Sequence, residues 1–359
     1  MPLVPQHIRN LKPYKPGRPI EEVRRELGLE HIIKLASNEN PHGPSPKALE
    51  AVQSTLADNF RYPDASAYLL REKLAECFNI KINNVVVGAG SEGVMSTIMR
   101  TFLRQGDEII AADNSFIGFR VLANASGVHT NWVPLKNYHH DLPEMAKQIN
   151  DYTKIIYLAN PDNPTGTYFP KSEFDAFMSL VPERVLVLLD EAYFEYACHL
   201  ADYPDSMHYR YDNVITLRTF SKAHGLAGFR VGYGFAHEDL IQNLNKVKLP
   251  FEPAWPAQIA AQAALDDTEY IKHTISHCHK GMKILEQAFY DNGIKTIPST
   301  ANFITLIFSS DKEAQTFNEK MLHNGIILRH LPGWGLPNCV RVTVGTEEEN
   351  NILMDNVNI

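Results

Sequence analysis

The segment VLVLLDEAY, residues 185–193, decides the fold, because five apolar residues in a row end at a single carboxylate. An unbroken apolar run of strand length indicates a strand that is buried on both faces, as in a parallel sheet covered by helices. Asp190 follows this run, at the carboxyl edge of the predicted strand. Open α/β sheets bind their ligands at that edge, so Asp190 is predicted to point into a site.

Four further apolar runs of strand length surround this segment and alternate with stretches of helix length. They are Val85–Val87, Ile109–Ala111, Lys154–Leu158 and Val214–Leu217. This rhythm predicts an α/β fold with a mainly parallel central sheet flanked by helices. We expect residues 46–268 to form this large domain.

A second, smaller α+β unit is predicted for residues 269–359. It opens with one long helix, Glu269–Asn292, which Gly293 ends, because glycine readily takes the left-handed conformation past a helix end. Its expected strands are residues 303–308, 325–329 and 340–344. Residues 1–45 are rich in proline and have no core of their own, so we expect them to pack against this smaller unit.

Composition excludes several classes of partner. The formal net charge is -8 and the pI about 6.0, whereas nucleic acids and anionic membranes select basic surfaces. The four cysteines are widely spaced without a C-x-x-C motif, and the start of the chain lacks the pattern of a signal peptide. No apolar run approaches the roughly 20 residues of a membrane helix. We expect a cytoplasmic protein with a small ligand, no nucleic acid and no membrane.

The motif GAGSEG, residues 88–93, follows a predicted strand and matches G-x-G-x-x-G. Asp113 lies about 20 residues further on, as the dinucleotide-binding fingerprint requires. A glycine turn that leads into a helix N-terminus, however, holds any phosphate through its free N–H groups and the helix dipole. The motif therefore predicts a phosphate site and leaves NAD open as an alternative.

A histidine-rich stretch at residues 273–279 could place His273 and His277 on one helix face at ligand spacing, with Cys278 and His279 beside them. No carboxylate partner is evident for a third ligand. A solvated helix surface is the better interpretation, and we expect no metal site.

Lys222 lies in TFSKAHGLAGFR, residues 219–230, directly after a buried strand and among small residues. A lone lysine in such a loop is usually a surface residue. Here Asp190 is predicted at the same sheet edge, where a carboxylate can keep a pyridine nitrogen protonated. Asp190 could instead be an ordinary helix cap.

The loop NPDNPTG, residues 160–166, follows another predicted strand and is stiffened by two prolines. Asn163 and Tyr193 could both hydrogen-bond a phenolate oxygen at this edge. Either residue alone would be read as a turn or core residue.

In their order and spacing these motifs resemble the fold-type I aminotransferases that use pyridoxal 5′-phosphate (PLP), and most closely the histidinol-phosphate aminotransferases. Arg230, eight residues after Lys222, belongs to the same pattern. The resemblance continues through residues 34–41, 61–64, 325–329 and 340–345, and so covers nearly the whole chain.

The resemblance implies a role for each matching residue around PLP. Lys222 would form the Schiff base and move the proton, with Asp190 on the pyridinium and Asn163 and Tyr193 on the ring oxygen. Phe116 would stack on the ring, where the family more often has tyrosine. The cofactor phosphate would be held by Gly90, Ser91, Ser221 and Arg230, with Tyr62 reaching across from the partner subunit of a homodimer.

For the substrates, the resemblance implies an anion grip made by Arg341 with Arg329 and Tyr14, and a contact from Asn40. The expected reaction is transfer of the amino group of L-histidinol phosphate to 2-oxoglutarate, a step of histidine biosynthesis. An aromatic-amino-acid aminotransferase and a threonine-phosphate decarboxylase remain as alternatives. The segment KLPFEPAW, residues 248–255, departs from the polar stretch expected in the family, which puts strict substrate choice in doubt.

Overall fold

A computed structural model describes residues 3–13, 15–206 and 211–357 of the protein. A seven-stranded sheet forms the larger body, in the order β2-β8-β7-β6-β5-β3-β4. Only β8 runs antiparallel to its neighbours. The strands are β2 (Val85–Gly88), β3 (Glu108–Ala112), β4 (His129–Val133), β5 (Thr153–Ala159), β6 (Leu186–Asp190), β7 (Val214–Thr219) and β8 (Gly232–Phe235). The predicted α/β fold with a mainly parallel sheet is confirmed.

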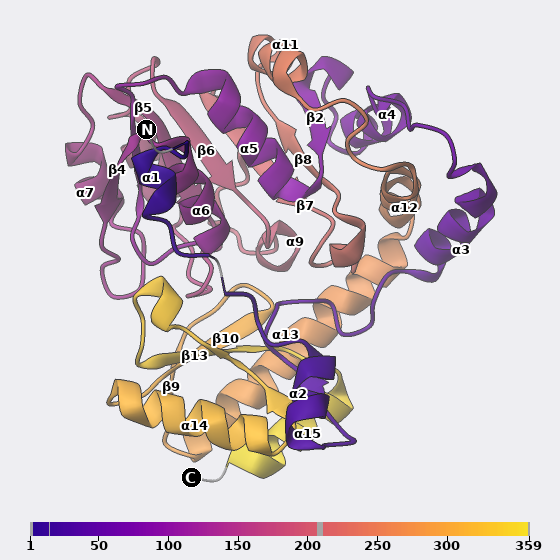
Figure 1. The fold of residues 1–359 in the computed structure, drawn as a ribbon, viewed down its shortest axis with the longest axis vertical. Helices are drawn as coiled ribbons and strands as arrows, with labels where there is room; N and C mark the ends of the chain where they lie inside the picture. Colours follow the sequence, from indigo (N-terminus) through magenta and orange to yellow (C-terminus); the bar gives the residue numbers. More distant parts are fainter. Residues whose placement is uncertain (1–2, 14, 207–210, 358–359) are drawn as a thin grey trace.

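Helices cover both faces of this sheet (Figure 1), as the apolar runs predict. Alternate residues of β5 show the two layers, because Ile155 and Tyr157 pack under one set of helices while Ile156 and Leu158 pack under the other. The first set is α5 (Gly90–Phe102), α6 (Ile117–Ser126) and α11 (Glu238–Val247); the second is α7 (Leu142–Lys147) and α8 (Lys171–Met178). Beside β2 and β8 pack α3 (Pro46–Thr55), α4 (Tyr68–Cys77) and α12 (Trp255–Leu265).

The smaller unit is built on α13 (Thr268–Asp291), which runs from the larger body along the small sheet (Figure 1). Gly293 ends this helix with a φ of 71°. The sheet is antiparallel, in the order β12-β13-β10-β9. Its elements are β9 (Lys295–Ile297), β10 (Phe303–Ile307), β12 (Arg329–His330), β13 (Cys339–Thr343), α14 (Asp311–His323) and α15 (Glu347–Val357).

The expected single strand at residues 325–329 is wrong. Ile326–Ile327 forms β11, which pairs in parallel with β1 (Ile33–Lys34), whereas Arg329–His330 forms β12 and pairs with β13. One short segment thus ties two sheets together. A positive φ at Gly325, 77°, lets the chain turn out of α14 into β11.

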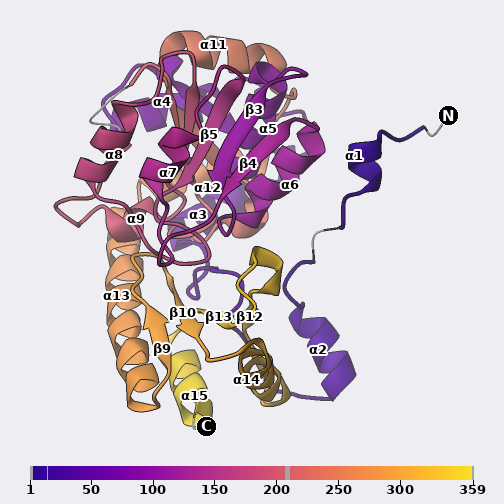
Figure 2. The same cartoon turned by 90° about the vertical axis from the view of Figure 1, so that its left-hand side faces the viewer.

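The N-terminal segment divides between the two bodies, unlike the expectation that all of residues 1–45 pack on the smaller unit. α2 (Ile20–Leu27) packs with β1 and β11. α1 (Gln6–Arg9) instead lies against α6 of the larger body, and Figure 2 shows it far from α2. Its residues are all exposed.

Among the described residues, no helix combines the length and apolar character needed to cross a membrane. All four cysteines are free thiols, with Cys77 and Cys198 exposed and Cys278 and Cys339 buried.

Candidate active site

One cavity opens at the carboxyl edge of the central strands, enclosing about 760 Å³ of space that is partly open to solvent. The strands β5, β6 and β7 each deliver side chains to it from their last residue or from the loop that follows. Eight of the predicted residues line it: Ser91, Phe116, Asn163, Asp190, Tyr193, Ser221, Lys222 and Arg230. The structure thus brings together residues that the sequence spreads over 140 positions, from 91 to 230.

Lys222 projects into this cavity from the loop after β7. Its Nζ donates to the Ser37 carbonyl oxygen at 3.3 Å and lies 5.8 Å from the centre of the Tyr193 ring. Burial, reinforced by the positive charge of Arg341, lowers the pKa of the Lys222 amine to about 8. A lysine that loses its proton near neutral pH can act as a nucleophile toward a carbonyl carbon.

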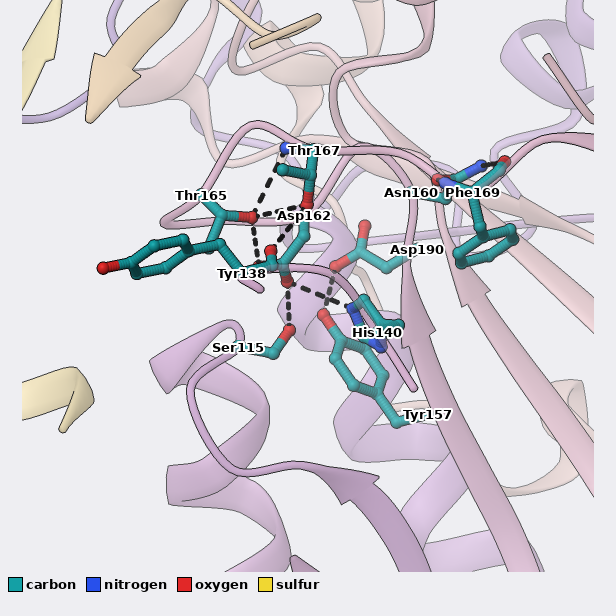
Figure 3. Close-up of polar contacts among 10 residues, drawn as sticks. All are labelled: Ser115, Tyr138, His140, Tyr157, Asn160, Asp162, Thr165, Thr167, Phe169 and Asp190. Atoms are coloured by element: carbon teal, nitrogen blue, oxygen red, sulfur yellow. Dashed lines mark hydrogen bonds and ion pairs between the residues drawn. The ribbon is translucent and has the colours of Figure 1, made fainter. Parts of the chain in front are cut away.

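Asp190 is the last residue of β6 and is almost fully buried. Its Oδ1 accepts from the Ala192 amide at 3.2 Å and closes the following turn, but Asp190 is not a helix cap, because the N-cap of α9 (Phe194–Ala197) is Tyr193. Its Oδ2 accepts from the Tyr157 hydroxyl at 2.8 Å (Figure 3). Burial raises the pKa of Asp190 to about 7, which suits a carboxylate that awaits a cationic partner.

The Tyr193 hydroxyl is held by two side-chain amides. The Nδ2 groups of Asn38 and Asn163 donate to it at 2.8 and 3.1 Å. Arg341 Nη1 donates to Asn163 Oδ1 and so fixes which end of that amide faces Tyr193. Because burial raises the pKa of Tyr193 to about 12, its hydroxyl keeps a proton that it can donate to a ligand oxygen.

An anion cradle lies where α5 begins. Gly90 has a φ of 76°, and a Cβ there would lie 2.6 Å from Arg230 Nη2. A Cβ on Gly232 would lie 2.4 Å from the Ser91 amide nitrogen, so glycine keeps the helix start open. Arg230 Nη1 reaches the Ser221 hydroxyl at 3.4 Å. Helix N–H groups, a hydroxyl and a guanidinium together form a phosphate site.

The dinucleotide-binding alternative requires a carboxylate at the cavity, and Asp113 does not supply it. Asp113 follows β3, but it pairs with Arg120 at 2.6 Å and does not line the cavity. The glycine motif at residues 88–93 therefore retains only its phosphate interpretation.

The carboxylate of Asp162, which lies within the loop of residues 160–167, fixes this loop through polar contacts (Figure 3). Its Oδ1 accepts from Ser115 Oγ at 2.5 Å and lies 3.3 Å from His140 Nε2, while Oδ2 accepts from Thr165 Oγ1 at 2.9 Å. Ser115 precedes Phe116, so Asp162 joins the loop of Asn163 to the turn of Phe116.

Of the remaining predicted residues, those that the structure describes do not line the cavity. Tyr62 is 81% exposed and stacks on Phe251 with ring centroids 4.4 Å apart. Asn40 donates to the Ala223 carbonyl oxygen at 3.0 Å, behind the Lys222 loop. Arg329 donates to the Lys15 carbonyl oxygen at 2.8 Å and lies over the Trp334 ring. Tyr14 falls outside the described residues.

The histidines of α13 form no metal site, since the described residues contain no suitable group of three His, Cys, Asp or Glu side chains. The expected solvated surface holds for His273, which is exposed, but not for His277 and His279, which are half-buried. His277 Nε2 lies 2.9 Å from the Gly345 carbonyl oxygen, and His279 Nε2 lies 3.1 Å from that of Tyr196. Cys278 is in the core.

Two residues of the site were not predicted. Asn38 lies within residues 34–41, a run that the resemblance includes without giving this residue a role, yet its bond to Tyr193 places it at the centre of the network. Tyr157 lies within an apolar run, so the sequence predicts an ordinary core residue there. Its position two residues before the strand end, on the same face as Ala159, is the signal that could have identified it.

Comparison with known proteins agrees with this geometry. The family of class I and II aminotransferases matches residues 30–357. Histidinol-phosphate aminotransferase 1 of Nitrosococcus oceani is 42% identical over 96% of this chain and 92% of its own length. The enzyme of that name from Akkermansia muciniphila is 43% identical over 96% of this chain and 95% of its own.

Among solved structures, the histidinol-phosphate aminotransferase of Sinorhizobium meliloti, in complex with pyridoxal-5′-phosphate, superposes with a TM-score of 0.91. It is 27% identical, and the match covers 99% of this chain and 97% of that one. The chain therefore belongs to the class I and II aminotransferases. Within that family, its full-length relatives at about 40% identity are the histidinol-phosphate aminotransferases.

Proposed function

We propose that the protein is a PLP-dependent aminotransferase that converts L-histidinol phosphate and 2-oxoglutarate to imidazole acetol phosphate and L-glutamate. The observation that carries this proposal is the cavity in which Lys222, Asp190 and the anion cradle meet. An amine with a lowered pKa, a buried carboxylate and a phosphate site are the three contacts that a phosphorylated pyridine aldehyde requires.

The residues present fit this cofactor. The start of α5 with Ser91, Ser221 and Arg230 would hold its phosphate dianion. Asp190 would face the ring nitrogen, the Tyr193 hydroxyl would donate to the ring oxygen, and Phe116 would cover one ring face. Asn163, which bonds Tyr193, lies beside that oxygen position. Gly90 serves by the absence of a side chain, which leaves room for the Arg230 guanidinium.

When bound, PLP acts as an electron sink for the substrate Cα, so that the Cα proton becomes removable. Lys222 Nζ would hold the cofactor covalently and, as a free amine, would accept and return the Cα proton. With a pKa near 8, this amine is able to accept a proton at neutral pH. Asp190 would hold the ring nitrogen in its protonated form.

For the substrate, Arg341 and Arg329 would bind the anionic group, with Tyr14 as a third contact. Arg341 is buried and hydrogen-bonded to Asn163, so it would contact the substrate directly and the cofactor site through Asn163. Asn40 bonds the backbone behind Lys222. We therefore propose that Asn40 supports the lysine loop, in place of the direct substrate contact expected from the resemblance.

We also propose a cytoplasmic homodimer in which Tyr62 completes the phosphate site of the partner subunit. Exposed apolar residues flank Tyr62 in the sequence, namely Leu56, Phe60, Tyr68 and Leu69, and its ring stacks on Phe251, close in sequence to the exposed Leu249. Such patches mark protein interfaces. Within each subunit, residues 46–268 would form the large domain and 269–359 the small one, with the segment before residue 46 shared between them.

The test is the visible spectrum of the purified protein, followed by separate half-reactions with L-histidinol phosphate, L-phenylalanine and L-threonine phosphate. Rapid loss of the cofactor's visible band with histidinol phosphate, and slow loss with phenylalanine, supports the proposal. Comparable rates would make the protein a broad aromatic aminotransferase, and release of carbon dioxide from threonine phosphate a decarboxylase.

The variant Lys222→Ala should lose both the Schiff-base band and turnover. A matched control is Lys248→Ala, because burial also lowers the pKa of Lys248 to about 8, yet Lys248 lies outside the cavity. A Lys222→Ala protein with an unchanged spectrum would refute the role of this lysine.

A further inference from the structure

Tyr157 is a buried tyrosine that no part of the proposed reaction yet uses. It stands in β5 beside β6, where Ala159 pairs with Asp190. Its hydroxyl donates to Asp190 Oδ2 at 2.8 Å (Figure 3), and only 1% of the residue is exposed. The bond therefore lies behind the cavity, on the carboxylate that would face the ring nitrogen.

The ring of Tyr157 cannot turn away from this carboxylate. Phe119 stacks on it with centroids 3.9 Å apart and an interplanar angle of 9°. Phe119 belongs to α6, the helix that follows Phe116 of the cavity wall. The same helix thus supplies the cavity-facing Phe116 and the residue that fixes the Tyr157 hydroxyl.

The charges around the pair make this hydroxyl important. Burial raises the pKa of Asp190 to about 7, and the Tyr157 hydroxyl is the largest influence that opposes burial. Burial also raises the pKa of Tyr157 well above its ordinary value, so Tyr157 stays a donor at every working pH. The other titratable groups that influence the two residues are Glu92 on α5, Glu191, Tyr193 and Asp162.

None of these other groups favours the ionised form of Asp190. Glu92 and Glu191 disfavour it by their negative charge. Apart from the Ala192 amide, which bonds Oδ1, Tyr157 is the hydrogen-bond donor that the described residues offer to this carboxylate.

We propose that Tyr157 is a positioning residue for the reaction, whose hydroxyl orients Asp190 and keeps it ionised opposite the ring nitrogen of the cofactor. The proposal rests on the proposed function, because it requires a pyridine ring in the cavity. It does not depend on which amino donor the enzyme prefers.

The test is Tyr157→Phe in the cofactor-loaded protein, since phenylalanine keeps the stack on Phe119 and removes only the hydroxyl. The half-reaction rate with saturating histidinol phosphate should fall roughly ten- to hundredfold, the effect of one hydrogen bond to a buried charge. KM should change little. The acidic limb of the rate against pH should move up by about one pH unit. The control is Tyr233→Phe, which changes another fully buried tyrosine, in β8. It should leave the half-reaction rate and the pH profile unchanged.

A Tyr157→Phe protein with the wild-type rate and pH profile would overturn the proposal and leave Tyr157 as core packing. A second arm compares Asp190→Asn with the double variant Tyr157→Phe/Asp190→Asn. Loss of the hydroxyl should have no further effect once the carboxylate is gone; a further large loss of rate would contradict action through Asp190.

Failure of the proposed function gives a different result. A wild-type protein without a PLP spectrum would refute both proposals together. A protein that binds PLP but prefers another donor would refute only the substrate, and the pH profile of Tyr157→Phe would then be measured with that donor.

Discussion

Arg341 shows how one residue can serve two ligands. Its Nη1 donates to Asn163 Oδ1 and its Nη2 to the Ala36 carbonyl oxygen at 2.9 Å. The guanidinium thus stands on the small-unit side of the site, away from the anion cradle at the start of α5. A planar fork of this kind can bind a phosphate or a carboxylate in turn.

Replacing Arg341 with alanine should lower kcat/KM for histidinol phosphate by about a hundredfold or more, because a buried charged contact to the substrate is lost. Retention of the cofactor, measured by absorbance after dialysis, should fall far less, because the variant affects the cofactor site only through the lost hydrogen bond to Asn163. Arg184→Ala, at the opposite edge of the sheet, is the control. Equal losses of turnover and cofactor would contradict a substrate role.

Asp190 makes the cofactor-free chain less stable as the pH rises. Its pKa of about 7 in the folded state exceeds the ordinary value of 3.8, so the folded chain binds more protons than the unfolded chain between these two values. The contribution of this carboxyl to the free energy of unfolding therefore falls from about pH 4 to about pH 7.

Asp190→Asn should remove this cost while strongly lowering turnover. In thermal unfolding of the cofactor-free protein, the variant should match the wild type near pH 4 and exceed it by a few degrees above pH 7, for a shift worth a few kcal/mol. Glu195→Gln should show the same trend, because burial also raises the pKa of Glu195 to about 7. A difference between Asp190→Asn and wild type that is independent of pH would refute this explanation.

Sequence patterns locate residues such as Lys222, Asp190 and Asn163 because each follows a strongly apolar strand, and parallel strands end at one edge. They do not locate Asn38 or Tyr157. Asn38 reaches Tyr193 across 155 positions of the chain, and no local pattern encodes such a contact. Tyr157 looks like any aromatic residue in a buried strand.

Strands, like site residues, could be predicted only where the local sequence carries a clear pattern. β6 and β5 were predicted because each contains an unbroken apolar run, whereas β4 (HTNWV) is an edge strand with polar residues and β8 (GYGF) contains two glycines. Neither β4 nor β8 contains an apolar run of strand length. The two-residue strands β1, β11 and β12 are too short for any periodicity. β1 and β11 exist because the N-terminal segment pairs with the small unit, and β12 exists because it pairs with β13 inside the small unit.

The loop that follows β1 couples the small unit to the cofactor site through Asn38. Its backbone amide donates to Thr343 Oγ1 at 2.9 Å, and its Oδ1 accepts from the same hydroxyl at 3.1 Å. Its Nδ2 then faces Tyr193. The end of β13 therefore sets the orientation of an amide that holds a residue of the cavity.

Asn38→Ala should lower the half-reaction rate about tenfold, because the Tyr193 hydroxyl loses one of its two donors. Thr343→Val should have a smaller effect in the same direction, since it frees the Asn38 amide without removing it. Both rates are measured by stopped-flow at saturating donor, with Asn356→Ala on the exposed face of α15 as a control. If Thr343→Val slowed the reaction while Asn38→Ala did not, Asn38 would not be the link.

At the scale of the whole molecule, each subunit is incomplete if Tyr62 serves the partner. Its ring lies 81% exposed against Phe251 and does not line the cavity of its own chain. A twofold dimer is self-complementary, so each subunit would give one Tyr62 and receive one. Two defects in different chains can then compensate each other.

Tyr62→Ala and Lys222→Ala, each nearly inactive alone, should recover activity when the two chains are co-expressed and purified as mixed dimers. One of the two sites in each mixed dimer then has Lys222 from one chain and Tyr62 from the other, so the purified mixed dimers should recover about half of wild-type turnover. Co-expression of Lys222→Ala with Asp190→Asn is the control and should restore nothing, because both residues act in the same chain's cavity and no site is complete. Absence of recovery in the first mixture would mean that Tyr62 acts within its own subunit or not at all.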